Sequence, residues 1–472
     1  MIGKYSYEIT HDDFAKGIST NDDMKDAGFS ANSTGIDIYT KPGIVLPVNP
    51  AVTVMSGITG LKFIASCDVL VTPYMRFFLG SDNTLYGYKT DGTVATIGPS
   101  GGSETYSVLN TDMIQFNAGI YASHTVDITK YTVSGGFVTN WFSTTAGGAA
   151  LNSSNPHPML NFNKQLYVAD GSILRKYDSD ANTSSLVFQQ SIETQIIALG
   201  IDPASGRMLV SFNINNGNNG LTNSTSFVGY YDGTNPTQFL KKIQVDASVT
   251  AFYSLGGTVY VVYGQNLGVW NGNGITFLRR LTSSQSYSIV SNKQKITNMG
   301  QVLVILDGTN LIAYGETIPG QKVFSNLASL SGVTSNVISC VGPNQTTGTG
   351  YTLIFGNDTL NALSKITIGQ TLVGSGTFYS NDTHFPRPKF IRGMDVFLDG
   401  IPSGSTLLTF TYKDDTDTTF DCSSAKTMTT AIGLRKKRFM FECKTTSFQV
   451  ICDFAASTKG LKRIIVYYDD AE

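Results

Sequence analysis

The most concentrated charge in the sequence is a run of four basic residues directly before an apolar strand pattern: Arg435, Lys436, Lys437 and Arg438. Such a run could contact an acidic protein surface or the backbone of a nucleic acid. Basic residues beside an apolar strand also protect that strand against edge-to-edge aggregation. We interpret the four residues as a solvated or interfacial patch and not as a site of nucleic-acid readout.

Other residues with reactive side chains form no recognisable site. The acidic run Asp415 to Asp421 resembles a calcium loop but lacks its glycine and its final bidentate glutamate, so a hairpin tip is favoured. No two histidines have the i, i+4 spacing of a helical zinc pair, the four being His11, His124, His157 and His384. The sequence predicts no catalytic residue, no cofactor and no metal site.

The cysteines are odd in number and include no C-x-x-C pair, the five being Cys67, Cys340, Cys422, Cys443 and Cys452. This pattern argues against a disulfide framework and against a zinc finger. Three of them, Cys422, Cys443 and Cys452, could converge on His384 in space. Free thiols inside strands are the favoured interpretation.

The composition predicts an all-β protein. Charged residues make up only 14% of the chain, whereas globular domains have about 25%. Small polar and turn-forming residues, including 48 glycines, take their place. Because helical surfaces are normally filled with charged residues and alanine, this composition disfavours helices. The net charge of −2 also removes the long-range attraction that nucleic-acid and anionic-membrane binders use.

A repeated pattern of strands runs through residues 58–375. An aromatic residue, or a leucine in the last unit, closes one strand of each repeat, at spacings of 39 to 54 residues: Tyr88, Tyr131, Tyr177, Tyr231, Trp270, Tyr314 and Leu363. A wholly β repeat of about 40–50 residues is typical of propeller blades. We predict a seven-bladed propeller, with six or eight blades as alternatives, in which these seven anchors pack between blades.

Both flanks of the repeat differ from it. Residues 376–472 carry 25 charged residues in 97, and their alternating apolar pattern predicts a C-terminal antiparallel β-sandwich. Residues 1–57 read as an irregular N-terminal arm. Within this arm, Asp37 to Tyr39 and Gly43 to Leu46 are strand-like, and we predict that they could pair with the last blade to close the ring.

The arrangement resembles virion structural proteins of tailed bacteriophages, especially tail nozzle (tail tubular protein B) types. The resemblance rests on the Gly17-Ile18-Ser19 arm, the Lys41-Pro42-Gly43 turn, the charge-poor propeller and the appended β-domain. The turn lacks an arginine present in that family, and the chain is shorter than typical members. The resemblance implies a non-enzymatic protein of the virion tail that forms a homo-oligomeric ring and binds other tail proteins.

Two other functions remain open. The first is a carbohydrate-binding module for receptor recognition, and the second is a propeller glycoside hydrolase, which would need paired carboxylates at the channel. We do not expect the protein to bind nucleic acid in a sequence-specific manner. Membrane insertion is not expected either, because the most apolar window, Ala51 to Val71, is interrupted by Lys62 and Asp68.

Overall fold

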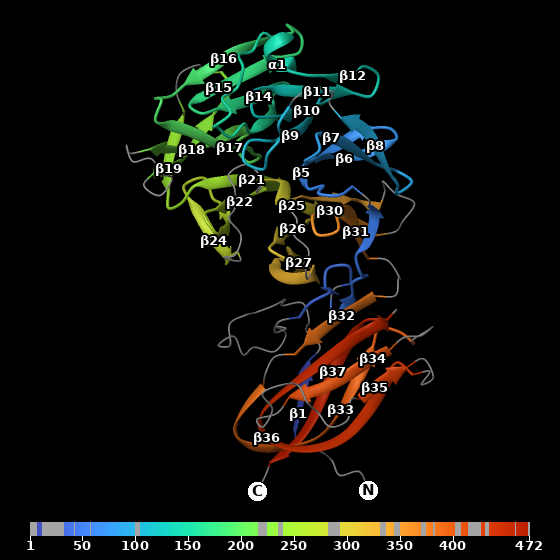
Figure 1. Cartoon of the computed structure of the whole chain (residues 1–472). Helices are drawn as coiled ribbons and strands as arrows, with labels where there is room; N and C mark the ends of the chain where they lie inside the picture. The colour runs from blue at the N-terminus through green and yellow to red at the C-terminus, as the bar shows by residue number, and fades with distance from the viewer. Residues whose placement is uncertain are drawn as a thin grey trace.

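The computed structural model describes residues 7–11, 33–41, 43–56, 58–99, 104–215, 224–234, 239–281, 293–330, 337–343, 350–369, 374–380, 383–401, 407–413, 426–429, 434–457 and 459–470. The predicted arm motif Gly17 to Ser19, the acidic run Asp415 to Asp421 and Cys422 lie outside these residues. The described part is built almost wholly of strands (Figure 1). Its α-helix, α1 (Trp141–Thr144), is one turn long, and no described helix could cross a bilayer.

The described residues form seven four-stranded antiparallel sheets, arranged as the blades of a propeller. The first three blades consist of β5 (Phe63–Val71), β6 (Tyr74–Gly80), β7 (Thr84–Lys89) and β8 (Val94–Pro99); β9 (Met113–Phe116), β10 (Gly119–Ser123), β11 (Ile128–Thr132) and β12 (Gly136–Val138); and β13 (Met159–Phe162), β14 (Gln165–Asp170), β15 (Ile173–Asp178) and β16 (Thr183–Gln189). The prediction of seven blades is confirmed.

The next three blades follow in chain order. They consist of β17 (Thr194–Asp202), β18 (Arg207–Asn215), β19 (Ser224–Tyr231) and β20 (Lys241–Val245); β21 (Val249–Leu255), β22 (Thr258–Tyr263), β23 (Asn266–Trp270) and β24 (Ile275–Arg280); and β25 (Ile296–Met299), β26 (Val302–Asp307), β27 (Asn310–Ile318) and β28 (Gln321–Ser329). A 3-10 turn, η3 (Lys293–Lys295), precedes β25.

The seventh blade closes the ring with a strand from the beginning of the chain. Its order is β29 (Ile338–Val341), β30 (Tyr351–Asn357), β31 (Ala362–Ile368) and β4 (Val52–Met55). Strand β29 in turn contacts β5 of the first blade. The predicted ring-closing segments are therefore wrong in position: residues of both segments pair with each other as β2 (Ile36–Asp37) and β3 (Leu46–Pro47), and the strand that follows them closes the ring.

The anchor residues pack between blades as predicted. In five successive blades, the anchor ring lies 5.7 to 6.3 Å from an aromatic ring of the preceding blade: Phe77–Tyr131, Phe116–Tyr177, Tyr167–Tyr231, Tyr230–Trp270 and Tyr260–Tyr314. Tyr88 of the first blade and Leu363 of the last share one buried cluster, which completes the circle. Because each anchor sits at the same place in its blade, one type of contact repeats around the ring.

The C-terminal part is a single curled sheet and not two separate sheets. Its strands are β32 (Gly374–Tyr379), β33 (Thr383–Leu398), β34 (Leu407–Lys413), β35 (Lys426–Thr429), β36 (Lys436–Ser457), β37 (Leu461–Asp470) and β1 (Tyr7–His11), which pairs with β37. The long β36 pairs with β33 through its first half and with β32 and β34 through its second half. The two halves thus enclose one core, as in the predicted sandwich.

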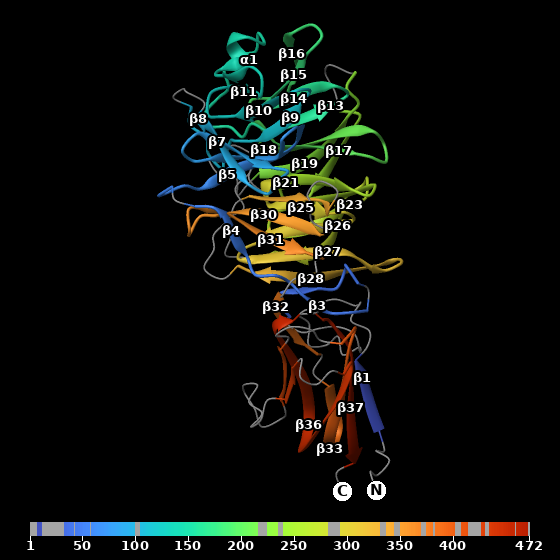
Figure 2. The ribbon, with the colours of Figure 1, turned by 90° about the vertical axis from the view of Figure 1, so that its right-hand side faces the viewer.

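A hairpin formed by residues 33–48 joins the propeller to the curled sheet (Figure 2). On the propeller side, Tyr39 Oη lies 3.1 and 3.0 Å from the carbonyl oxygens of Ala313 and Val323. On the sheet side, Val45 pairs with Leu461, and Lys41 Nζ lies 3.0 Å from Asp399 Oδ2. The propeller and the sheet therefore lie at opposite ends of an elongated body.

Candidate functional site

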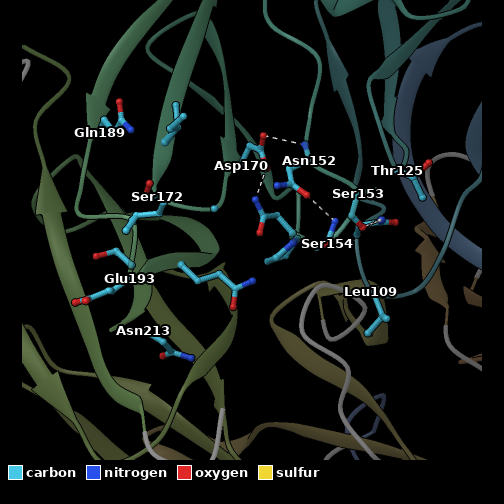
Figure 3. A pocket seen from close by; sticks show the side chains of 18 of the residues that line it. Leu109, Thr125, Asn152, Ser153, Ser154, Asp170, Ser172, Gln189, Glu193 and Asn213 are labelled. Atoms are coloured by element: carbon cyan, nitrogen blue, oxygen red, sulfur yellow. Dashed lines mark hydrogen bonds between the residues drawn. The ribbon is translucent and has the colours of Figure 1, made fainter. Parts of the chain in front are cut away.

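A pocket of about 900 Å³ lies at one end of the second, third and fourth blades (Figure 3). Successive turns of an antiparallel blade alternate between its two ends. The connections between blades and the turns between the second and third strands therefore share one end of the propeller. All pocket residues come from these segments or from strand ends beside them, including Leu109, Thr125, Asn152, Gly171 and Ile192.

The pocket is lined by uncharged polar side chains and two carboxylates. Six amides contribute to it: Asn110, Asn152, Asn155, Gln189, Gln195 and Asn213. Six hydroxyls accompany them: Ser107, Thr125, Ser153, Ser154, Ser172 and Thr194. The carboxylates are Asp170 and Glu193, and none of the described lining residues is basic or aromatic. Such a lining offers many hydrogen-bond donors and acceptors and no cation for an anionic ligand.

Asp170, at the end of β14, holds the loop that forms one wall of the pocket. Its Oδ1 accepts a hydrogen bond from Asn155 Nδ2 at 2.7 Å, and its Oδ2 accepts one from the backbone nitrogen of Asn152 at 3.0 Å. Gly171 follows with a φ of +58°, and a Cβ there would lie 2.6 Å from Asn155 Nδ2. A residue without a side chain is thus required where the turn meets the loop.

A buried histidine lies behind this loop. The nitrogens of His157 lie 3.0 Å from the carbonyl oxygen of His124 and 2.9 Å from that of Asn152. Burial alone would raise the pKa of Asp170, but the nearby His157 ring and hydrogen bonds from Asn155 and the Asn152 backbone outweigh it and hold the pKa below its ordinary value. Asp170 is therefore a fixed carboxylate. It differs from the general acid of a glycosidase, which needs a raised pKa.

The central channel is crossed by η3, next to the pocket end of the propeller. Lys293 Nζ lies 2.9 Å from Asp112 Oδ2, which belongs to the second blade on the other side of the ring. Lys293 also donates to the carbonyl oxygen of Met159 at 3.3 Å, and Gln294 Oε1 accepts from Ser66 N at 2.8 Å. One short turn therefore connects the first, second and third blades. The cavity beside it is about 10 Å³, room for about one water.

The basic run Arg435 to Arg438 lies at the start of β36, far from the pocket (Figure 1). Two of its members have a structural partner, because Lys436 Nζ and Arg438 Nε lie 2.7 and 2.6 Å from the oxygens of Asp395. The Asp395 side chain is fully buried. The interfacial patch of all four residues remains a prediction, since Lys436 and Arg438 are also partly exposed; Arg435 is exposed, and Lys437 Nζ lies 4.8 Å from the centroid of the Phe439 ring.

We predict that Asp395→Asn lowers the free energy of unfolding by about 2 kcal/mol at pH 7, because charge-assisted hydrogen bonds are lost. Burial alone would raise the pKa of Asp395, but hydrogen bonds from Arg438, Lys436 and Tyr467 hold it well below its ordinary value. Such a group stabilises the fold above the pKa of the unfolded chain, about 3.9. The stabilisation is lost as the pH falls below that value.

The measurement is urea unfolding of the variant and the unchanged protein from pH 7 down to pH 3. The difference between them should shrink below about pH 4. Glu442→Gln is the matched control, since Glu442 is 72% exposed and pairs with Arg392 at the surface, where such pairs contribute less than about 1 kcal/mol. An equal difference at pH 7 and pH 3 would contradict the role given to Asp395.

Cys67, Cys340 and Cys452 form no disulfide, and no three His, Cys, Asp or Glu side chains among the described residues are arranged to hold a metal ion. Cys67, Cys340 and Cys452 are buried, as expected for thiols inside strands. Burial raises the pKa of the Cys67 thiol above its ordinary value. These thiols are therefore protonated at neutral pH.

Sequence reasoning missed both the pocket and the turn across the channel. The pocket residues come from three blades and belong to no motif, and Lys293 is separated from Asp112 by 181 positions. One signal was present in the sequence. The polar run Asn152-Ser153-Ser154-Asn155 falls between two blade patterns, where a loop on the surface of a propeller is expected.

No family model matches the chain, and no curated protein matches it in sequence. Among solved structures, it is similar to PorZ, an essential bacterial surface component of the type-IX secretion system of Porphyromonas gingivalis, with 12% identity and a TM-score of 0.41 over 67% of this chain. The chain spans 37% of PorZ.

Two further structures show the same general similarity. A chain of the mitotic checkpoint complex matches 69% of this chain over 94% of its own length, with 9% identity and a TM-score of 0.42. An exo-β-1,3-galactanase from Phanerochaete chrysosporium matches 69% over 98% of its length, with 11% identity and a TM-score of 0.26. These similarities concern propeller-like architecture alone. The blade count follows from the strand pairing of this chain.

Proposed function

We propose that this protein is a non-enzymatic structural component of a bacteriophage tail, which assembles as a homo-oligomeric ring and binds other tail proteins. The observation that carries the proposal is the hairpin of residues 33–48, which is hydrogen-bonded to the propeller and to the curled sheet. It contains the Lys41 to Gly43 turn on which the resemblance to tail nozzle proteins partly rests. A joint bonded on both sides resists bending, which suits a protein that holds other subunits in place.

The contacts of this joint with the curled sheet are mainly between backbone groups, whereas its contacts with the propeller use the hydroxyls of Tyr39 and Ser325. Thr34 N donates to Thr377 O at 3.0 Å, and Thr377 N donates to Thr34 O at 2.8 Å. Nearby, Gly376 approaches Gly35 so closely that a Cβ on it would lie 2.2 Å from the Gly35 carbonyl oxygen. Since backbone hydrogen bonds fix both direction and register, the joint holds the sheet at one defined place on the rim of the ring.

Quantitative mass spectrometry of purified phage particles tests this proposal. We expect the protein at a constant ratio to the major tail protein in independent preparations. A non-structural protein encoded by the same phage serves as the control and should be lost during purification. Absence of this chain from particles that contain the other tail proteins would overturn the proposal.

A further inference from the structure

We propose that the pocket at the end of the second, third and fourth blades binds a neutral oligosaccharide. The blades whose loops line the pocket lie on the side of the ring away from the curled sheet, as the positions of β14 and β16 relative to β33 and β36 show (Figure 1). If the sheet and the joint face the rest of an assembly, this side faces outward. A polar pocket in that position is accessible to a glycan on another surface.

The chemistry of the lining selects a neutral ligand with many hydroxyl groups. Amide side chains offer a donor and an acceptor side by side, which matches neighbouring hydroxyls of a sugar ring. Carboxylates accept strong hydrogen bonds from hydroxyls, and Asp170 and Glu193 provide two of them. No described lining residue is basic, so nothing in the lining favours a phosphate or an acidic sugar. The volume of about 900 Å³ is within the range of ligand pockets, about 300–1,000 Å³.

The polar groups of the pocket are held in place before any ligand arrives. Asn152 Oδ1 accepts from the backbone nitrogen of Ser154 at 3.0 Å, and Asn110 is held by Ser107 Oγ at 2.7 Å. The neighbouring blades are joined by a hydrogen bond from Ile196 N to the carbonyl oxygen of Gly171 at 2.8 Å. Polar groups that are already fixed lose little conformational entropy on binding. This low cost favours binding of a sugar, because each single hydrogen bond to a sugar contributes little binding free energy.

Two further features point to a ligand. Asn213 is 2% exposed, and its Oδ1 has no hydrogen-bond partner among the described residues, although its Nδ2 donates to Ser248 Oγ. Figure 3 shows Asn213 on the same side as Glu193 and facing Leu109 across the pocket. Ile192 and Leu109 are 94% and 57% exposed. Such aliphatic side chains can pack against the C–H face of a sugar ring, in place of the aromatic platform that the lining lacks.

The experiment uses the full chain on an array of neutral hexose and N-acetylhexosamine oligosaccharides, followed by calorimetric titration of the strongest one. We expect Glu193→Ala and Gln189→Ala each to weaken binding about tenfold or more, as loss of a hydrogen bond to the ligand implies. Both side chains are exposed, so these variants should fold. Asn161→Ala, an exposed amide at the other end of the third blade, is the matched control and should bind unchanged.

Three outcomes would overturn the inference. One is that no oligosaccharide on the array binds; another is that the chain prefers a peptide array to the sugars. The third is that Asn161→Ala weakens binding as much as the two pocket variants. Asn155→Ala provides a second test, because it removes both a pocket amide and the partner of Asp170, and it should abolish binding. All of these measurements use the isolated chain, so their result is independent of the presence of the protein in particles.

Discussion

Asp112→Ala is expected to lower the free energy of unfolding by about 2–4 kcal/mol, because several buried hydrogen-bond donors would lose a charged acceptor. The Asp112 side chain is 1% exposed and accepts from Lys293 Nζ. It also accepts from Gln294 Nε2 at 3.2 Å and from the backbone nitrogen of Met159 at 2.9 Å. The backbone nitrogen of Met113 donates to it as well, at 2.9 Å, so alanine would leave four donors without this acceptor in the middle of the ring. Urea unfolding followed by tryptophan fluorescence measures the change.

Two controls make this prediction specific. Asp180→Ala removes an exposed carboxylate from the third blade and should change the unfolding free energy by less than about 0.5 kcal/mol. In the double variant Asp112→Ala with Lys293→Ala, the two losses should not add, because both changes remove one interaction. If Asp112→Ala behaved like Asp180→Ala, the turn across the channel would contribute nothing to stability.

Replacement of Val52–Met55 by Gly-Ser-Gly-Ser is expected to open the propeller. This change removes the fourth strand of the seventh blade and leaves the hairpin of residues 33–48 unchanged. The outer edge of β31 would then be unpaired, and an unpaired strand edge is a template for association with other chains. We expect fast hydrogen exchange in Ala362–Ile368 and loss of the monodisperse species in size-exclusion chromatography with light scattering.

Deletion of residues 1–32 is the control for ring closure. It removes β1 but keeps the hairpin and β4, so the exchange rates of β31 should stay as in the unchanged protein. Arg76 Nη2 also donates to the carbonyl oxygen of Cys340, which joins the first and last blades. If the Gly-Ser variant kept full protection in β31, contacts of this kind would suffice to close the ring without β4.

The sequence contained enough information for the blades because each blade repeats the same local pattern. Turns with Asp-Gly or Asn-Gly need positive φ, and Gly92, Gly233 and Gly272 have φ values of +82°, +87° and +85°. The anchor aromatics were predictable because they recur at the same position of this repeated pattern. Ring closure was predicted in the correct arm but at the wrong residues, because Val52–Met55 is only four residues long and partly exposed.

The candidate sites were less predictable, since they depend on pairs that are distant in the sequence. The ion pairs of Lys436 and Arg438 were not predicted, because Asp395, their buried partner, lies on another strand about 40 residues earlier. The pocket combines side chains of three blades. Ordinary asparagine, serine and glutamine residues in loops carry no signal until the fold brings them to the same end of the ring.

The pairing of β1 with β37 imposes an order on folding. The propeller needs only the chain up to Ile368, because β4 is made early and pairs with β31 as soon as that strand exists. The curled sheet needs residues from both ends of the chain, with Tyr7 opposite Tyr468. Strand β37 is the last described strand to be synthesised. During synthesis on the ribosome, a closed ring is therefore expected to precede the sheet, and β1 has no strand to pair with until β37 emerges.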